Sequence, residues 1–307
     1  MKQIGYDRNL FVQPFDHRGS FTKSYFGFKG APTIDPSTEQ FVKVAQGKTL
    51  IYRGLLGAIE RGVPAETVGI LVDAQFGSHI LEDAKSKGIP AAVCVEKSGQ
   101  NVFDFEYGAR WEDHIRFIRP DIVKVLVRFH PQDDPVINRE QMARLKLLSD
   151  YIHATDDHHL MFELLVPATT DDDKKAGDRY DSEIRFRHMV ESIRTLQDYG
   201  IEPDIWKLEG LDKRDQAEAV AEQARAGQAR KKVGCIILGR GSDKAQVHKW
   251  LQVAAPVPGF IGFAVGRTNF SEPLKKYLED PKHEAAAIQE IAENYKGCVD
   301  TWRAAAS

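Results

Sequence analysis

Short apolar runs recur along this chain, and longer segments with a polar pattern separate them. Each run is rich in Val, Ile and Leu, and such nearly continuous hydrophobicity is typical of strands that are buried on both faces. We expect eight strands, which are parallel if helices fill the intervals between them. The expected strands span residues 10–15, 68–72, 91–95, 122–129, 159–166, 204–208, 233–238 and 260–265.

Helical patterns do lie in those intervals. Asn138, three residues before Gln141, is the expected N-cap of one helix. A second helix is amphipathic, and Gly200 is a favourable residue to end it. The expected helices span residues 48–61, 138–152, 181–199, 212–226 and 284–295.

Eight alternating units indicate a closed (β/α)8 barrel, the TIM barrel, rather than an open sheet. Such a barrel takes about 250 residues as one domain, so we expect a single domain over residues 1–307. Two intervals, 25–44 and 169–180, are expected to be longer loops. The second holds three consecutive aspartates and then Lys174 and Lys175. It is either a lid over the site or, as is commoner, a plain solvated loop.

Charge and composition exclude several classes of function. The formal net charge is −3, whereas a nucleic-acid binder usually carries a clear basic excess. No run of 18 apolar residues is present, and the polar N-terminus lacks the apolar stretch of a secretory signal. Three cysteines without CxxC spacing predict no disulfide framework. We therefore expect a cytoplasmic protein that acts on a small molecule away from membranes, either as a monomer or as a homo-oligomer.

Charged residues stand in expected strands where a barrel interior normally holds branched apolar side chains. Lys124, Glu163 and Lys207 lie inside consecutive strands, and Asp16 follows the first strand. Side chains alternate between the two faces of a strand, so all three strand residues can point inward. They then form a row of lysine, carboxylate and lysine across one wall of the barrel. A buried ion network that braces the wall is the other interpretation, but three such residues on consecutive strands favour a functional site.

Such a row suits the chemistry of a Schiff base. A lysine attacks a carbonyl carbon only as the neutral amine, and burial beside another cation can lower its pKa by several units from a reference of about 10.4. A carboxylate between two lysines can move the protons of carbinolamine formation. The residues therefore indicate a Schiff-base lyase that needs neither a metal nor another cofactor. The spacing does not say whether Lys124 or Lys207 reacts.

At these positions the chain resembles the tagatose-bisphosphate aldolase family of class I aldolases. It resembles still more closely the aldolase-like domain that is fused to the sugar kinase of bacterial inositol catabolism. Each matching motif is short, but seven of them follow in order across nearly the whole chain. The motifs begin at Asp16 (DHRG), Ile70 (ILVDAQFG), Glu96 (EKSG), Val123 (VKVL), Phe162 (FELL), Asp204 (DIWK) and Gly266 (GR).

This resemblance implies a role for each residue of the row. Lys207 matches the lysine that forms the Schiff base, and Glu163 matches the acid–base residue. Asp16 and Lys124 match two further active-site positions. The family cleaves ketose phosphates to dihydroxyacetone phosphate and an aldehyde. For the inositol-linked domain the implied substrate is 2-deoxy-5-keto-gluconate 6-phosphate, and the aldehyde is malonate semialdehyde.

Three departures argue against tagatose bisphosphate as the substrate. His17 stands where the tagatose branch is expected to have a glutamine. The motif at Asp73 replaces an acidic-aromatic one, and the stretch that begins at His130 replaces a tyrosine-rich one. Tagatose-bisphosphate aldolase and sulfofructose-phosphate aldolase are kept as alternative assignments.

Glycines and arginines follow the last two expected strands, where barrel enzymes commonly bind phosphate. Gly239, Arg240 and Gly241 follow the seventh strand, and Gly266 and Arg267 follow the eighth. Glycines let an anion approach backbone N–H groups, and an arginine can add a bidentate contact. We therefore expect the substrate phosphate at these two loops.

Further cationic residues follow other strands. Arg18 and Lys97, after the first and third strands, are candidates for substrate binding. The sequence leaves open whether these two, Glu96 or Arg128 touch the substrate.

Two other functions compete with the aldolase. A metal-dependent enzyme would use histidines, but the adjacent His158 and His159 point opposite ways in an extended chain, and a solvated loop before the fifth strand explains them better. A non-catalytic regulatory protein that binds a sugar phosphate is the second rival, because a fold does not determine a function. Two inward lysines beside a carboxylate disfavour it. The other residues weighed for a metal site are His17, His130, His153, Asp156 and Asp157.

Overall fold

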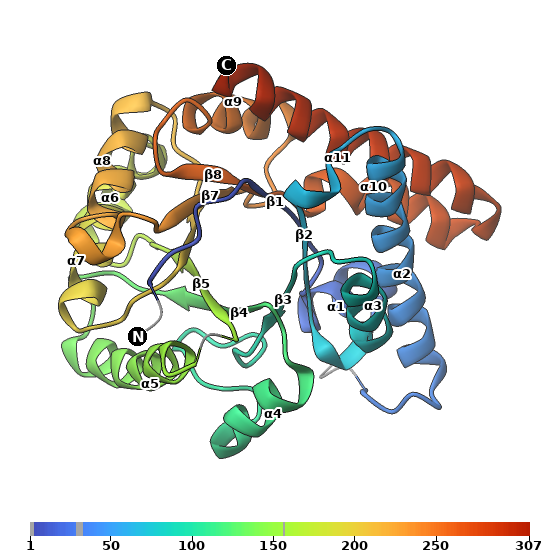
Figure 1. The fold of residues 1–307 in the computed structure, drawn as a ribbon, viewed down its shortest axis with the longest axis horizontal. Coiled ribbons are helices and arrows are strands. Elements are labelled where there is room, and N and C mark those ends of the chain that lie inside the picture. The colour runs from blue at the N-terminus through green and yellow to red at the C-terminus, as the bar shows by residue number, and fades with distance from the viewer. Residues whose placement is uncertain (1–2, 29–32, 156) are drawn as a thin grey trace.

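A computed structural model of the protein describes residues 3–28, 33–155 and 157–307. Its eight parallel strands close into a barrel in the order of the chain, with β1 next to both β2 and β8 (Figure 1). The expected (β/α)8 TIM barrel is therefore confirmed, and no strand end differs from its expected position by more than one residue. Residues 1–2, residues 29–32 of the loop expected at 25–44, and Asp156 lie outside this description. The strands are β1 Leu10–Pro14, β2 Val68–Val72, β3 Ala91–Cys94, β4 Ile122–Arg128, β5 His159–Leu165, β6 Ile205–Glu209, β7 Gly234–Leu238 and β8 Phe260–Ala264.

Helices surround the barrel. The α-helices are α1 Gly19–Phe26, α2 Glu39–Glu60, α3 Ala74–Ser86, α4 Trp111–Ile118, α5 Pro135–His153, α6 Asp171–Ala176, α7 Arg185–Asp198, α8 Arg214–Ala224, α9 Lys244–Ala254, α10 Arg267–Glu279 and α11 Glu284–Ala306. Short 3-10 helices occur at Ala65–Thr67, Gly108–Arg110, Gln228–Arg230 and Pro281–His283, and a π-helical turn, η3, spans Tyr180–Ile184. None of the described helices is long and apolar enough to cross a membrane.

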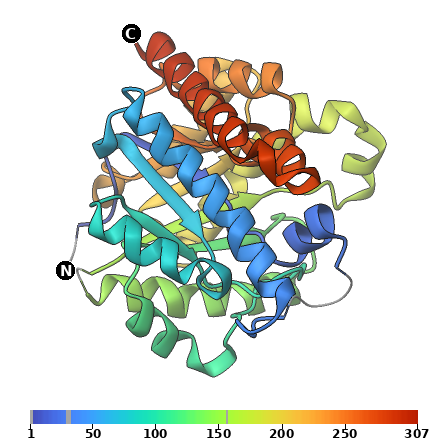
Figure 2. The same cartoon turned by 90° about the vertical axis from the view of Figure 1, so that its right-hand side faces the viewer.

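The first and last parts of the chain pack together on the outside of the barrel. Helix α11 lies beside α2 (Figure 2) and also contacts α9 and α10. Tyr295 of α11 is fully buried, and its hydroxyl donates a hydrogen bond of 2.6 Å to the carbonyl of Phe11 in β1. This bond ties the C-terminal helix directly to the first strand.

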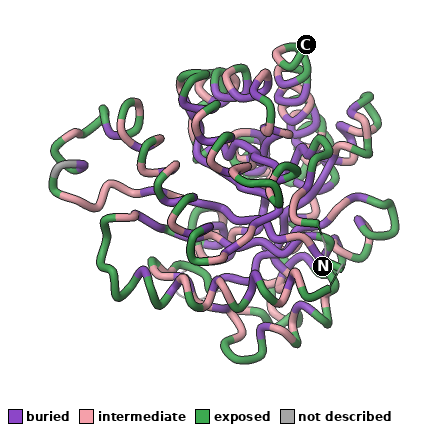
Figure 3. The backbone as a smooth tube through the Cα atoms, turned by 60° about the vertical axis from the view of Figure 1, so that its left-hand side comes forward, coloured by how far each residue is buried: buried purple, intermediate pink, exposed green. Residues whose placement is uncertain are grey.

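Two apolar cores follow from the alternation of side chains along each strand. The larger core lies between the barrel and the helices, and buried positions gather on the strands while the outer faces of the helices are exposed (Figure 3). The smaller core fills the barrel interior with side chains from every strand. It includes Ile122, Met161 and Ile205, so the residues two positions further along β4, β5 and β6 point inward as well. Those residues are Lys124, Glu163 and Lys207.

One expected helix cap is wrong. Helix α5 begins at Pro135, and its N-cap is Asp134, whose carboxylate accepts a hydrogen bond of 2.8 Å from the backbone N–H of Val136. Asn138 lies inside the helix and is buried, and its amide donates to the carbonyl of His130 at 2.8 Å. A proline at the first helical position is as strong a start signal as an asparagine, and the contact with residue 130 needs the folded barrel.

Other helix boundaries also differ from expectation. Helix α2 begins at residue 39 rather than 48, and α1 occupies residues 19–26. Of the long loop expected at 25–44, the described residues outside helices are therefore 27–28 and 33–38. Helix α11 continues to residue 306 rather than 295. Its extra turns carry the buried residues Cys298, Val299 and Trp302, which pack against the larger core.

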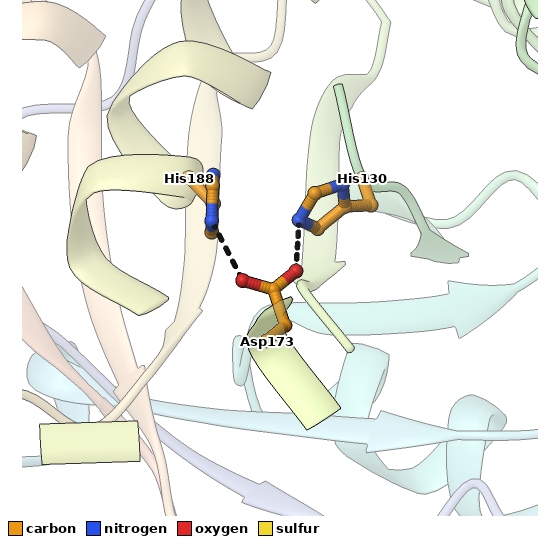
Figure 4. Close-up of side chains that lie close together, drawn as sticks. All are labelled: His130, Asp173 and His188. Atoms are coloured by element: carbon orange, nitrogen blue, oxygen red, sulfur yellow. Dashed lines mark hydrogen bonds and ion pairs between the residues drawn. The ribbon is translucent and has the colours of Figure 1, made fainter. Parts of the chain in front are cut away.

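The segment expected as a loop at 169–180 is folded and anchored. It contains α6 and leads through η3 into α7. Asp173 of α6 is 4 % exposed, and its carboxylate oxygens lie 3.0 Å from Nε2 of His130 and 3.1 Å from Nε2 of His188 (Figure 4). The prediction of a plain solvated loop is therefore wrong, because a buried carboxylate holds this segment against the end of β4 and against α7.

The histidines before β5 are also not in a solvated loop. His158 is 7 % exposed, and its Nδ1 lies 2.7 Å from the carbonyl oxygen of Pro120. His159 begins β5 and packs edge-on against the ring of Tyr6, with 5.2 Å between the ring centroids. Both residues belong to the N-terminal end of the barrel. In TIM barrels, residues at this end usually stabilise the fold and do not take part in catalysis.

Asp204 organises that end of the barrel. It is fully buried, and its carboxylate accepts hydrogen bonds from the backbone N–H groups of Gly5 at 2.7 Å and Leu160 at 2.8 Å. Burial acts to raise the pKa of Asp204, but His153, His159 and the two N–H groups outweigh it and hold that pKa well below its ordinary value. The carboxylate therefore joins the N-terminal segment to β5 and β6 as an anion.

We expect Asp204→Asn to lower the free energy of unfolding at pH 7 by about 2 kcal/mol, because a hydrogen bond to a charged group contributes about 1.5–3 kcal/mol. The pKa of Asp204 is lower in the folded chain than in the unfolded chain, where it is about 3.9. The contribution is therefore present in full above that value and is lost as the pH falls towards the folded pKa. Urea denaturation at pH 7 and pH 3.5 measures the free energy of unfolding of both proteins. The difference between wild type and variant should be smaller at pH 3.5.

The matched control is Asp300→Asn, because Asp300 forms an exposed ion pair with Lys296 one helical turn away. Its effect should stay within about 0.5 kcal/mol. If the difference in free energy of unfolding between wild type and Asp204→Asn grows as the pH falls, the role given to this carboxylate is contradicted.

Candidate active site

A cavity of about 780 Å³ lies at the C-terminal ends of the strands. Its lining includes Asp16, Glu96, Lys124 and Glu163 from the ends or interiors of β1, β3, β4 and β5. In TIM barrels this is the face that carries the active site. The barrel thus brings the expected candidates together around one space.

Lys124 is the centre of the charged cluster. It is 1 % exposed, and its ammonium lies 2.9 Å from Asp16 Oδ2, 2.6 Å from Glu96 Oε1 and 2.9 Å from Glu163 Oε2. Burial acts to lower the pKa of Lys124, but the three carboxylates outweigh it and hold that pKa well above its ordinary value. Lys124 is therefore a permanent cation.

Lys207 completes the row that the alternation of side chains predicted. It stands beside Glu163 in the register of β5 and β6, and its amine lies 2.9 Å from Glu163 Oε2. The same carboxylate oxygen thus contacts both Lys124 and Lys207. Lys207 is 3 % exposed and does not itself line the cavity, whereas Glu163 does. Glu163, which lines the cavity, is thus in direct contact with the Lys207 amine.

The two carboxylates nearest the lysines are anions. Burial acts to raise the pKa of Asp16, but Lys124, His17 and Lys207 hold it well below its ordinary value. Burial also acts to raise the pKa of Glu163, and Lys124 together with Lys207 lowers it below its ordinary value. Each is therefore ionised and is a weak base.

Glu96 differs from both, and sequence analysis left its contacts open. Burial raises the pKa of Glu96 above its ordinary value, and the negative charge of Asp16 adds to this effect, although Lys124 opposes it. The balance of burial and charge explains the direction. At Glu96, burial and the negative charge of Asp16 outweigh the positive charges of Lys124 and Arg18, whereas at Asp16 and Glu163 the nearby cations outweigh burial. One of the three acids therefore binds a proton more readily than the others, and it is Glu96.

Arg18 supports the end of β3. It is 5 % exposed, and its guanidinium donates to the carbonyl of Glu96 at 2.5 Å and pairs with Glu106 at 3.0 Å. Arg18 lines the cavity, as do Lys97 and Arg128, both of which are exposed. The structure thus places Lys97 and Arg128 with their charges at the cavity, while Arg18 has protein partners on two sides.

A buried ion pair that sequence analysis missed holds the end of β1. Lys48 of α2 is fully buried and donates to the carbonyls of Phe15 at 2.5 Å and His17 at 3.0 Å. It also pairs with Asp73 Oδ2 at 2.5 Å, while Asp73 Oδ1 accepts from the backbone N–H of Phe76 and caps α3. The aspartate of the ILVDAQFG motif is therefore structural: it positions the loop that carries Asp16 and His17.

The loops expected to bind phosphate lie side by side. Arg267 begins α10, and its guanidinium lies so close to Gly241 that a Cβ at that glycine would be 2.8 Å from it. Gly241 also has a φ of +75°, which side chains disfavour. At Gly266 a Cβ would lie 2.4 Å from the carbonyl oxygen of Pro14. These close contacts explain the glycines at positions 241 and 266 by packing alone, without a bound phosphate.

Arg240 lines the cavity but is already ion-paired. Its backbone has a φ of +51°, an uncommon conformation for a residue with a side chain. Its guanidinium lies 2.9 Å from Asp181 in η3 and 3.1 Å from Glu209 at the end of β6. Glu209 also pairs with the buried Arg185 at 3.0 Å. A substrate phosphate at Arg240 would therefore share the arginine with two carboxylates. Arg267 lines the same cavity, and no carboxylate of the described residues pairs with it.

Two groups of described residues have the composition of a metal site. One is Asp16, Cys94 and Glu96, where the ammonium of Lys124 already supplies the positive charge. The histidines weighed from the sequence do not gather there. His17 lines the cavity, and its Nδ1 lies 3.8 Å from Asp16 Oδ1. His153 and His159 flank Asp204 at the other end of the barrel.

The second group is His130, Asp173 and His188 (Figure 4). The backbone N–H of Gln132 donates to Nδ1 of His130 at 3.2 Å. Nδ1 must then be the unprotonated nitrogen, which leaves the ring proton on Nε2, the atom that faces Asp173. Each imidazole also faces a different oxygen of the carboxylate. The His188 contact is a hydrogen bond, whereas Nε2 of His130 and Oδ2 of Asp173 lie 3.0 Å apart without a hydrogen-bond partner among the described residues. The three side chains form a clamp that holds α6 in place.

Comparison with known proteins places the chain in a family. A profile of the family described as "Uncharacterized protein conserved in bacteria (DUF2090)" matches residues 6–306. The chain belongs to this family. No curated protein sequence matches it.

Two solved structures resemble this DUF2090 barrel. Fructose-bisphosphate aldolase from Plasmodium falciparum, in a complex with TRAP and an inhibitor, matches with a TM-score of 0.66 and 11 % identity, over 96 % of this chain and 90 % of that one. Cgl0159 from Corynebacterium glutamicum matches with a TM-score of 0.54 and 17 % identity, over 96 % of this chain and 88 % of that one. At these identities the likeness shows the fold alone.

We expect the pKa of Glu96 in this DUF2090 protein to lie above 4.5, the ordinary pKa of a glutamate. Carbon-13 NMR of labelled glutamate carboxyl groups measures this directly, because each resonance shifts as its group loses a proton. One glutamate resonance should have a midpoint above 4.5 and be absent from Glu96→Gln. A resonance that is lost in Glu96→Gln but titrates below 4.5 contradicts the balance of burial and charge described above.

Proposed function

We propose that this protein is a class I aldolase that forms a Schiff base on Lys207. The observation that carries the proposal is the contact of one Glu163 oxygen with both Lys124 and Lys207, each at 2.9 Å, in a charged cluster inside a closed barrel. A structural brace would need one ion pair, and a buried cluster of five charged groups is costly to maintain for stability alone. The fold shared with a class I aldolase and the motif resemblance support the same chemistry.

The proposed reaction begins with a proton transfer from Lys207 to Glu163. The neutral amine attacks the ketone carbon of the substrate and forms a carbinolamine. Glu163 returns the proton to the departing hydroxyl group, water leaves, and an iminium ion remains. The bond between the α and β carbons then breaks, and the iminium accepts its electron pair to become an enamine. Lys124 keeps Glu163 oriented throughout, because its own ammonium stays charged.

The cavity supports a substrate with an anionic group at each end. Arg240 and Arg267 lie at the loops after β7 and β8, where we propose that the phosphate binds. Lys97 and Arg128 lie at the loops after β3 and β4, and we propose that they bind a carboxylate. A phosphorylated keto-sugar acid fits both ends. The preferred substrate is therefore 2-deoxy-5-keto-gluconate 6-phosphate, which would be cleaved to dihydroxyacetone phosphate and malonate semialdehyde.

Tagatose bisphosphate and sulfofructose phosphate also carry two anionic ends and remain the alternative substrates. A regulatory protein that only binds a sugar phosphate is the alternative from another class. It has no need of an amine in contact with an ionised carboxylate that can accept its proton, and the Lys207–Glu163 contact therefore favours the enzyme.

Lys207→Ala should abolish cleavage, with a loss on the order of 10⁴-fold or more, because the covalent intermediate has no other nucleophile. Incubation of the wild type with dihydroxyacetone phosphate and borohydride should add one reduced adduct to the peptide that contains Lys207, as read by mass spectrometry. The control Lys146→Ala removes an exposed lysine of α5 and should leave both results unchanged. Near-normal cleavage by Lys207→Ala refutes the role of this lysine.

A panel of three substrates tests the specificity. 2-Deoxy-5-keto-gluconate 6-phosphate, tagatose bisphosphate and sulfofructose phosphate are incubated separately with the wild type, and dihydroxyacetone phosphate is detected by a coupled enzyme. We expect the first to be cleaved most efficiently, because it matches the phosphate and carboxylate ends of the cavity. Preferential cleavage of either other substrate reassigns the aldolase. No cleavage and no borohydride adduct together support the regulatory protein.

A further inference from the structure

We propose that Glu96 is the catalytic residue that takes the proton from the substrate hydroxyl group when the C–C bond breaks. This inference rests on the aldolase proposed above and adds a residue to its mechanism. The reaction needs such a base, because the aldehyde forms only when the hydroxyl on the far side of the breaking bond loses its proton.

The position of Glu96 suits this role. It follows β3, lines the cavity and is 9 % exposed. Its Oε1 contacts the ammonium of Lys124 at 2.6 Å. Its Oε2 is buried and has no hydrogen-bond partner in the part of the chain that the structure describes. A buried carboxylate oxygen without a partner is costly, and a substrate hydroxyl group in the cavity would supply that partner.

Glu96 and the Schiff-base lysine stand at the two ends of a row of contacts that crosses the neighbouring strands from β3 to β6. Contacts run from Lys207 to Glu163, from Glu163 to Lys124, and from Lys124 to Glu96. A substrate bound to Lys207 has its iminium carbon at one end of this line. The bond that breaks starts at the next carbon, and the hydroxyl group lies on the carbon after that. A substrate that extends from Lys207 towards β3 would bring this hydroxyl group to Glu96, where Lys97 and Arg128 also line the cavity.

The other two carboxylates are less suitable bases. Glu163 has its Oε2 between two lysine amines and serves the formation of the Schiff base. Asp16 also has an oxygen, Oδ1, without a hydrogen-bond partner among the described residues. However, Lys124 and other cations hold the pKa of Asp16 well below its ordinary value, while the pKa of Glu96 is raised. A stronger base takes a hydroxyl proton more readily, which favours Glu96.

The step balances in protons and electrons. The ionised Glu96 Oε2 takes the hydroxyl proton, and the oxygen's electron pair forms the carbonyl of the departing aldehyde. The electron pair of the C–C bond moves to the iminium, which becomes an enamine. Glu96 is then the neutral acid. In the reverse reaction it returns the same proton to the oxygen of the incoming aldehyde as the new C–C bond forms.

Two measurements on Glu96→Gln separate this step from the formation of the Schiff base. The first is borohydride trapping with dihydroxyacetone phosphate, together with deuterium exchange into dihydroxyacetone phosphate from solvent. Both report the iminium and enamine without any aldehyde. The second is cleavage of the full substrate. We expect trapping and exchange to stay within about threefold of wild type and cleavage to fall by about 10²–10⁴-fold, the usual contribution of a general base.

Trapping in the variant also reports that the site is folded. Glu112→Gln is the matched control, because it neutralises an exposed glutamate of α4 and should change neither measurement. Cleavage by Glu96→Gln within about threefold of wild type overturns the inference, and so does an equal loss of trapping and cleavage, which would assign Glu96 to the structure of the site. Absence of an adduct in the wild type is a different result, because it overturns the aldolase proposal itself.

Discussion

The ammonium of Lys124, bound by three carboxylates inside the barrel, is the interaction on which the rest of this structure depends. It joins the ends of β1, β3, β4 and β5 through Asp16, Glu96 and Glu163. Removal of one partner from a buried ion pair usually costs about 3–5 kcal/mol, because the remaining charge is left without compensation. Lys124 therefore shapes the site and holds its acids close together at the same time.

The balance of burial and charge in this cluster gives the acids different properties. The lysines hold Asp16 and Glu163 as anions, while burial together with Asp16 raises the pKa of Glu96. An aldolase needs acids with different pKa values, because one group must move protons at the lysine nitrogen and another at the substrate oxygen. The arrangement follows from Coulomb interactions in a buried space, where each charge acts strongly on its neighbours.

Structural pairs outside the cluster keep its parts in position. Lys48 and Asp73 hold the end of β1, and Arg18 holds the end of β3. The clamp around Asp173 holds the segment after β5, and Glu209 ties Arg240 and Arg185 to the end of β6. The face that would bind substrate is thus supported by ion pairs rather than by apolar packing alone.

The amino-acid pattern was sufficient to predict the strands, the barrel and the inward row of Lys124, Glu163 and Lys207. These properties are local: hydrophobicity reveals a buried strand, and alternation with a period of two shows which residues share a face. The clamp of His130 on Asp173, the partners of Arg240 and the raised pKa of Glu96 could not be predicted in this way. Each depends on distances between residues far apart in the chain, and only closure of the barrel brings those residues within reach of one another.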